Sequence, residues 1–599
     1  MRRLKAFALF LSNVVATVVL VALAGAIAWG VWQVLPDSTR SVFRDPQAAV
    51  QGAQRGVRAG PANPFTALIE RVREWFAERR DLIDAVIAAD GTSGGITPLP
   101  GWASADQRHV FGATETLWQS RRGKLSGARW SRVVFAWSEV QPGGPRDWRA
   151  HYYLRDDLIQ RERANGIEVV GLLQATPAWA ATRREDGGRA VPAGLYRDAN
   201  DPQNTWAVFV RKMASEYRGR IDTWIIWNEP DILPDGPNSQ YYNWAGDERD
   251  YARLLAVANQ AAKAGNPRAR IVFAATTYWV DQNAGRPLFL DRVLAILAAE
   301  PPVPGAWPFD AVALNLYSSP DDLRRVGAIY REVLDRHGAG VPLWLTETNA
   351  TPYDDPARGL ARPPNGIRVT MDQQSSFVLQ AMAMGLTAGY ERLAIHSLTD
   401  RDTTDELWGL MRNDGTLRPA FVAYQTAARY LGGADRVEFA GRERARWPWP
   451  QGGYLPNWQV YLVVVERPAG VPGAPPPGPA PDATPTPGRG LRLPWDPDPG
   501  PPQPVALGRQ RVSVLWNGDA EAVQVTLPRV AERASLIDKY GRVLPLEPDG
   551  ERWRVTLAGA TAHSPLDPEG FYYVGGDPVL LVEDGVAEGA PVVPPEIAA

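Results

Sequence analysis

The chain has 599 residues and a formal net charge of −3, with 64 Lys and Arg side chains against 67 Asp and Glu. A chain of this length exceeds a single hydrophobic core, so we expect two or more domains. The nearly balanced charge gives no electrostatic basis for a nucleic-acid partner, and the absence of cysteine excludes disulfide bonds.

The first 36 residues have the composition of a membrane segment. Basic residues at the start precede an uncharged stretch over 6–35, and a membrane-spanning helix requires only about 20 apolar residues. We therefore predict a transmembrane anchor over 1–36. The alternative is a cleaved signal peptide, which would leave a secreted protein. Basic residues also follow the span, so the positive-inside bias for a cytoplasmic N-terminus is weak.

Residues 37–95 are predicted to form a linker followed by an amphipathic helix. Gly, Ala, Gln and Arg dominate up to about Pro64, as in a flexible spacer. Apolar side chains then recur at helical spacing between Phe65 and Ile87, with Glu and Arg between them. Three partners are compatible with this helix: the domain that follows, the membrane surface, or a second copy of the helix.

Between residues 96 and 435 the chain alternates between strand-like and helix-like segments, a pattern typical of parallel β/α units. The eight predicted strands are His109–Ala113, Arg129–Trp137, Ile167–Gln174, Ile221–Trp227, Arg270–Ala275, Phe309–Leu316, Leu343–Thr346 and Arg392–His396. A doubly wound open sheet would require a glycine-rich phosphate turn after an early strand, and the first turn, at 112–115, has none. The fold class is therefore predicted as α/β, a (β/α)8 TIM barrel.

Two glutamates stand at the ends of predicted strands. Glu229 directly follows Asn228 after the fourth strand, and Glu347 follows the seventh. Residues at the carboxyl ends of barrel strands form the active-site face, so we expect both carboxylates on one rim. Two carboxylates held on one rim are the groups that cleave a glycosidic bond.

Other polar and aromatic side chains at or just beyond the strand ends are candidates for substrate binding. They are Arg132, Trp137, Trp179, Asn228, Tyr278, Asn315, Tyr317, His396 and Trp408. The five histidines show no metal-ligand spacing. The acidic loop residues are interpreted as solvated, with a calcium site as the alternative. We expect no metal and no cofactor.

The sequences Asn228-Glu229-Pro230 and Thr346-Glu347-Thr348-Asn349, on strands four and seven of eight, resemble the glycoside hydrolases of clan A. The likeness covers about residues 100–435 and is nearest to family 39, the β-xylosidase and α-iduronidase group. It implies Glu229 as the acid/base and Glu347 as the nucleophile of a retaining mechanism. Such a mechanism places the carboxyl groups about 5–5.5 Å apart, so one of them keeps its proton near neutral pH.

The resemblance also implies roles for neighbouring residues. Asn228 would hydrogen-bond the sugar 2-hydroxyl, and Tyr317 would hydrogen-bond the nucleophile. Arg132 either holds Glu347 ionised or forms a structural ion pair.

Two positions depart from the pattern of the clan. Asn315 stands where the clan often has His, and His396 ends the strand where a Trp often forms the floor of the sugar site. Trp408 either takes over the stacking role or belongs to the core. These departures leave the identity of the sugar open.

Residues 436–599 are predicted to form a β-sandwich, because short alternating strands with turn residues between them replace the β/α pattern. A Pro- and Gly-rich insertion at 468–504 cannot bury a core and is expected to be an exposed loop. The sandwich either supports the barrel or binds glycans.

These features predict a retaining glycoside hydrolase at the cell membrane, held by one N-terminal span, with its catalytic domain outside the cytoplasm. Its partner would be an extracellular oligo- or polysaccharide. The alternative is a catalytically inactive, membrane-anchored scaffold that binds glycans or the cell envelope. The sequence does not distinguish hydrolysis from transglycosylation or exo from endo action.

Overall fold

The computed structural model describes residues 110–235, 239–301, 306–356, 367–400, 407–443, 458–468, 509–564 and 567–598. The predicted anchor, the linker with its amphipathic helix and the Pro-rich insertion lie outside these residues, apart from Pro468. Within the described residues, no helix combines the length and apolarity that a membrane crossing requires.

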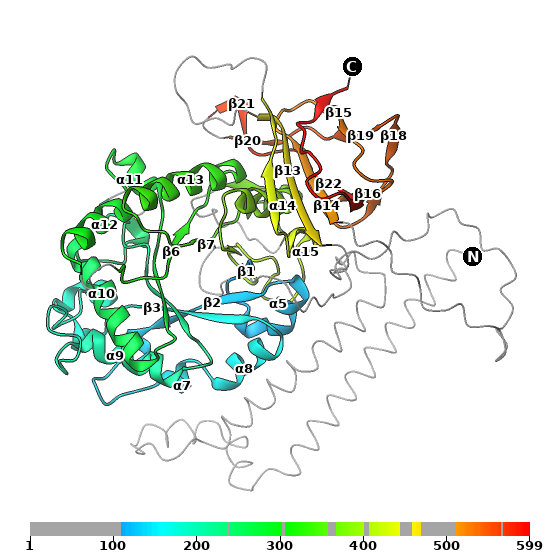
Figure 1. The fold of residues 1–599 in the computed structure, drawn as a ribbon. Coiled ribbons are helices and arrows are strands. Elements are labelled where there is room, and N and C mark those ends of the chain that lie inside the picture. Colours follow the sequence, from blue (N-terminus) through cyan, green and yellow to red (C-terminus); the bar gives the residue numbers. More distant parts are fainter. Residues whose placement is uncertain are drawn as a thin grey trace, which may run out of the picture. The chain divides into compact units, whose positions relative to one another are not determined.

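Eight parallel strands close into a barrel (Figure 1), in which each strand pairs with its neighbour in sequence and the last pairs with the first. They are β1 (Phe111–Ala113), β2 (Trp130–Ala136), β3 (Glu168–Gln174), β4 (Thr223–Asn228), β5 (Arg270–Thr276), β6 (Ala311–Asn315), β7 (Leu343–Glu347) and β10 (Arg392–Ile395). Each strand lies within, or shifted by a residue from, a segment predicted from the sequence. The predicted (β/α)8 barrel is confirmed.

Helices enclose these strands (Figure 1). The longer ones are α5 (Ser120–Ser126), α8 (Asp156–Ala164), α9 (Thr205–Glu216), α10 (Glu248–Gly265), α12 (Phe289–Ala299), α13 (Pro320–Arg336), α14 (Met371–Thr387) and α15 (Pro419–Leu431). Local sequence signals mark the N-termini of several of these helices. Asp247 and Thr370 form capping boxes at the N-termini of α10 and α14, and a proline stands in the first turn of α13 and α15.

Short elements occupy the connections of the barrel. They are η1 (Leu117–Gln119), α6 (Trp137–Val140), α7 (Ala150–Tyr153), η2 (Ala178–Ala180), η3 (Arg184–Arg189), η4 (Ser239–Tyr241), α11 (Trp279–Asn283), β8 (Thr351–Pro352) and β9 (Arg368–Val369). Most of them follow the carboxyl ends of strands, where the loops of such a barrel build the functional face.

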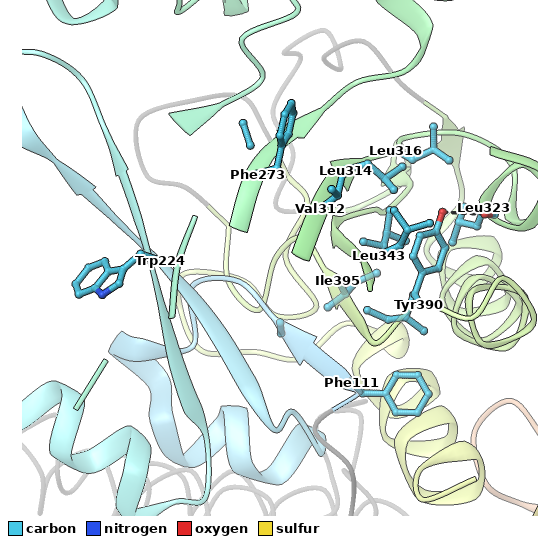
Figure 2. Close-up of a cluster of buried hydrophobic side chains, with 14 of the residues drawn as sticks. Phe111, Trp224, Phe273, Val312, Leu314, Leu316, Leu323, Leu343, Tyr390 and Ile395 are labelled. Atoms are coloured by element: carbon cyan, nitrogen blue, oxygen red, sulfur yellow. Dashed lines mark hydrogen bonds between the residues drawn. The ribbon is translucent and has the colours of Figure 1, made fainter. Parts of the chain in front are cut away.

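Strand side chains alternate between two apolar layers. Ile225 and Val272 belong to the cluster inside the barrel, whereas their neighbours Trp224 and Phe273 belong to the layer between strands and helices. Figure 2 shows part of this outer layer. Tyr390, drawn there, donates a hydrogen bond of 2.9 Å to the Leu323 carbonyl, so its hydroxyl has a partner within the apolar layer.

Two antiparallel sheets follow the barrel and form the predicted β-sandwich. One contains β11 (Arg436–Phe439), β12 (Arg442–Glu443), β13 (Trp458–Pro468), β14 (Arg509–Asn517), β16 (Arg533–Asp538), β17 (Val543–Leu544) and β22 (Val579–Val586). The other contains β15 (Val523–Pro528), β18 (Glu547–Asp549), β19 (Arg552–Leu557) and β23 (Glu596–Ile597). A hairpin of β20 (Ala562–Ser564) and β21 (Asp567–Val574) accompanies them. Leu462 and Leu515 of the first sheet share one buried cluster with Val525 and Trp553 of the second.

Polar contacts join the sandwich to helix α14 of the barrel. Lys539, only 2% exposed, donates to the Asp577 carboxylate at 2.7 Å and to the Ser376 hydroxyl at 3.0 Å. Gln380 of α14 donates to the Gly576 carbonyl at 2.8 Å. The sandwich therefore packs on the helix that follows the Glu347 strand.

Close packing between neighbouring strands generates a stability prediction. A Cβ added at Gly171 of β3 would lie 2.3 Å from the indole of Trp224 on β4. We expect Gly171→Ala to lower the free energy of unfolding by about 1–3 kcal/mol through overpacking. Denaturant titration measures this, with Gly340→Ala as the matched control because no atom lies within 4 Å of its added Cβ. Equal stability of the two variants would contradict the prediction.

Candidate active site

A cavity of about 400 Å³ opens at the carboxyl ends of the barrel strands, within the size range of ligand sites. Its lining consists of Arg132, Val134, Leu172, Gln174, Asn228, Glu229, Ile232, Tyr241, Asn243, Thr277, Trp279, Asn315, Tyr317, Glu347, His396 and Trp408. Both predicted catalytic glutamates are among these residues. The cavity is therefore the candidate active site.

The end of β4 turns two consecutive side chains into this cavity. Successive side chains of a regular strand point to opposite faces, yet Asn228 and Glu229 both line the site. The backbone makes this possible by adopting φ of 72° at Trp227 and 48° at Glu229. The Glu229 amide donates to the Ala275 carbonyl of β5 at 2.7 Å, which holds the turn. Such conformations are unfavourable for residues other than glycine and concentrate at functional sites.

The surroundings of Glu229 favour its protonated form. Burial is the largest factor that raises the pKa of its carboxyl, and the nearby charge of Glu347 raises it further. The Asn315 side chain donates to Glu229 Oε1 at 2.7 Å and opposes the shift. Burial and repulsion outweigh this hydrogen bond, so the pKa of Glu229 lies well above its ordinary value.

Asn315 of β6 is held in the orientation that this contact requires. Its Oδ1 accepts a hydrogen bond of 2.7 Å from the Thr346 hydroxyl on β7. The amide nitrogen therefore faces Glu229, and it also donates to Asn228 Oδ1 at 3.2 Å. One carboxamide thus connects three strand ends around the site.

Glu347 has the opposite environment and is 7% exposed. Its carboxylate forms an ion pair with Arg132 of β2 and accepts a hydrogen bond of 2.6 Å from the Tyr317 hydroxyl. Burial is the largest single factor and lowers the pKa of the Arg132 guanidinium. The charge and hydrogen bond of Glu347, with smaller contributions from Glu115 and Tyr317, together raise this pKa above its ordinary value. Both contacts expected for Glu347 are therefore present, and they favour its ionised form.

Aromatic rings cover the side of the cavity next to Tyr317. The ring of Trp408 lies 4.9 Å from that of Tyr317, centroid to centroid, and His396 meets Tyr317 edge-on at 6.3 Å. Thr114 Oγ1 lies 2.9 Å from His396 Nδ1. Both Trp408 and His396 line the cavity, so Trp408 stands at the site although it is only 6% exposed.

Two tryptophans predicted to bind substrate do not line the cavity. Trp137 is fully buried and stacks on Phe209 with ring centroids 4.8 Å apart. It begins helix α6 directly after β2, and its indole lies in the layer of side chains outside the strands. Trp179 packs edge-on against Trp137 and donates to the Gln141 carbonyl at 2.7 Å. Tyr278 does not line the cavity either, whereas its neighbour Trp279 does.

Several lining residues were not anticipated. Gln174 ends β3 and Thr277 follows β5 directly, so the rule that strand ends face the site would have identified them. Tyr241 and Asn243 belong to the long connection after β4, and their distance in sequence from the strand gives no signal of this kind. Within the described part of the chain, no group of three or more His, Asp or Glu is arranged to hold a metal ion.

No protein-family model matches this sequence, and no curated protein is similar to it. Among solved structures, a family 39 glycoside hydrolase from the gut symbiont Bacteroides cellulosilyticus WH2 has a TM-score of 0.50 at 13% identity, over 80% of this chain and 81% of that chain. A monomeric β-xylosidase from Caulobacter crescentus CB15 has a TM-score of 0.42 at 15% identity, over 80% and 97%. A family 30 subfamily 8 xylanase from Clostridium acetobutylicum has a TM-score of 0.45 at 12% identity, over 80% and 97%. The likeness to the family 39 enzyme confirms, for the fold, the resemblance to clan A.

The repulsion between the two carboxylates predicts a change in titration. We expect Glu347→Gln to lower the pKa of Glu229, because ionisation no longer creates a second adjacent negative charge. The pKa should stay above the ordinary value, because burial, the largest cause, remains. Infrared spectra over a pH titration measure this, with the carboxyl band assigned by its absence from Glu229→Gln. Asn315→Leu should shift the pKa of Glu229 upward, and an unchanged titration in both variants would contradict the coupling.

Proposed function

We propose that this protein is a retaining O-glycoside hydrolase that cleaves extracellular glycans through a glycosyl-enzyme intermediate. The observation that carries the proposal is the pair of glutamates on one cavity in opposite electrostatic surroundings. Glu229 is disposed to keep its proton, and Glu347 is paired with a cation and a phenol hydroxyl. Two carboxyl groups in environments that favour different protonation states are what acid and nucleophile require.

In the first step, a Glu347 oxygen bonds to the anomeric carbon as the bond from that carbon to the leaving oxygen breaks. Glu229 transfers its proton to the leaving oxygen, so the leaving group departs as a neutral alcohol. The charge of Glu347 is lost in the new ester. Because that charge raises the pKa of Glu229, the pKa of Glu229 falls once the intermediate forms.

In the second step, the ionised Glu229 takes a proton from water while the water oxygen bonds to the anomeric carbon. Glu347 leaves as a carboxylate, and Glu229 is again protonated. Arg132 and Tyr317 hold the nucleophile at both stages, and Asn315 holds the acid/base. Asn228, next to Glu229, is assigned to the sugar 2-hydroxyl, where a hydrogen bond strengthens as the transition state develops.

The rest of the lining suits a neutral, hydroxyl-rich ligand. The carboxamides of Gln174, Asn228, Asn243 and Asn315 offer both donors and acceptors to hydroxyl groups. The indoles of Trp279 and Trp408 add flat apolar faces. An inactive scaffold would need neither the strained backbone at Glu229 nor two carboxylates on one cavity, so we favour the enzyme. Transfer to a sugar acceptor shares the same intermediate.

Removal of the nucleophile tests the proposal. We expect Glu347→Ala to lower kcat for an activated aryl glycoside by at least about 10⁴-fold, since the covalent route is lost. Azide should restore part of the activity by displacing the leaving group directly, giving a glycosyl azide of inverted configuration. Glu229→Ala should instead give an azide of retained configuration, because azide then attacks the glycosyl-enzyme. Product analysis by NMR distinguishes these results, and wild-type turnover in Glu347→Ala would refute the assignment.

We further propose that residues 1–36 anchor the protein in the membrane as a single span, with the catalytic domain outside the cytoplasm. The uncharged stretch at 6–35 and the extracellular nature of polymeric glycans support this placement. A secreted form released by cleavage after the stretch is the alternative.

Protease treatment of intact cells tests the topology. We expect the catalytic domain to be digested from outside and to sediment with membranes before digestion. A cytoplasmic marker protein controls for cell integrity. Recovery of the full chain after digestion of intact cells, with loss only after lysis, would place the domain inside and contradict the proposal. Recovery of a shortened chain in the medium would instead indicate the cleaved form.

A further inference from the structure

A buried ionic cluster lies beside the candidate active site without lining it. Arg418, fully buried, donates from Nε to Asp355 at 2.5 Å and from Nη1 and Nη2 to the two oxygens of Asp400, each at 2.8 Å. Arg412 donates to Asp355 from the other side at 2.9 Å. Asp355 belongs to the connection after β7, and Asp400 to the connection after β10. The cluster therefore ties together two loops of the functional face.

The same guanidinium fixes the backbone next to Trp408. Arg418 Nη1 also donates to the Gly409 carbonyl at 2.6 Å, and the Gly409 amide donates to Asp400 Oδ1 at 2.8 Å. The neighbouring backbone lies so close to Gly409 that a Cβ at residue 409 would be 2.3 Å from the Met411 carbonyl oxygen and 2.5 Å from the Asp400 nitrogen. Only glycine fits there.

Trp408 is held from its other side as well. Asn349 donates from Nδ2 to the Trp408 carbonyl at 2.7 Å and to the His396 carbonyl at 2.9 Å. The indole of Trp408 then packs against Tyr317, whose hydroxyl donates to Glu347. A continuous series of contacts thus connects Arg418 with the carboxylate proposed as nucleophile.

We propose that Arg418, with Asp355 and Asp400, is a positioning residue that sets the place of the Trp408 indole in the sugar site. The guanidinium of Arg418 serves four acceptor atoms on two loops through its planar fork. A lysine ammonium has three donors on one nitrogen and cannot reproduce the two parallel hydrogen bonds to Asp400. A buried ion pair is weak evidence for a role in stability, whereas a fixed aromatic wall requires a rigid support. The effect on catalysis rests on the proposed glycosidase function.

A double-mutant cycle tests the inference through turnover of an aryl glycoside. We expect Arg418→Lys to lower kcat/KM by at least about tenfold, as a displaced site wall does. In the Trp408→Ala background the same change should have less than about a twofold effect, because its target is gone. Equal losses in the two backgrounds, or wild-type activity of Arg418→Lys, would overturn the proposal.

A readout without turnover separates this inference from the proposed function. In protein labelled with fluorotryptophan, the ¹⁹F resonance of Trp408 is assigned by its absence from Trp408→Phe. We expect Arg418→Lys and Asp400→Asn to shift or broaden that resonance. Arg511→Lys is the matched control, since Arg511 is 4% exposed and paired with buried Glu466 in the sandwich.

The outcomes of the two experiments are distinct. A Trp408 resonance that Arg418→Lys leaves unchanged, or that Arg511→Lys alters equally, overturns the positioning role whether or not the protein cleaves glycosides. A specific change in the resonance with no turnover by the wild-type protein on any aryl glycoside supports the positioning role and refutes the proposed function. Thermal unfolding of each variant identifies those that have lost the fold.

Discussion

The repulsion between two carboxyl groups that face one cavity is the constraint on which the rest of the site depends. Two ionised glutamates cannot be buried together, so the protein gives them different partners. Glu347 has a guanidinium and a phenol hydroxyl, and Glu229 has a single carboxamide. Because burial and the neighbouring charge outweigh that carboxamide, the pKa of Glu229 is raised and its protonated form is favoured. The difference between the two carboxyl groups follows from which strand carries Arg132 and which carries Asn315.

This asymmetry requires side chains from several strands to be fixed together. Arg132, Asn315 and Glu347 come from β2, β6 and β7, and the closed barrel sets their separation. At β4 the regular strand would have directed either Asn228 or Glu229 away from the cavity. Left-handed conformations at Trp227 and Glu229 allow both to face it. Packing of the Trp227 indole against Trp244 and its hydrogen bond to the Asn243 carbonyl help to stabilise this turn.

The loops beyond the strands have a separate role. The carboxyl pair lies at the strand ends, whereas Tyr241, Asn243, Trp279 and Trp408 line the cavity from the connections that follow the strands. The ionic cluster at Arg418 does not line the cavity, but it holds the backbone beside Trp408 through a hydrogen bond to the Gly409 carbonyl. The barrel fold is shared with a family 39 glycoside hydrolase of 13% identity, and such a fold does not by itself define a function.

The sequence by itself determined the eight strands, the sandwich and the position of both glutamates, because apolar periodicity is local and strand ends in a parallel barrel share one face. The resemblance to clan A also implied the contact of Tyr317 with Glu347. The position of Arg132 on the second strand gave pairing with Glu347 as one of two interpretations. Only the tertiary structure decided which of the predicted tryptophans line the cavity. Trp137 and Trp408 both follow strands, yet one is fully buried outside the cavity and the other lines it. That choice depends on the direction of the chain after each strand and on contacts such as those of Asn349 and Arg418, which join segments distant in sequence.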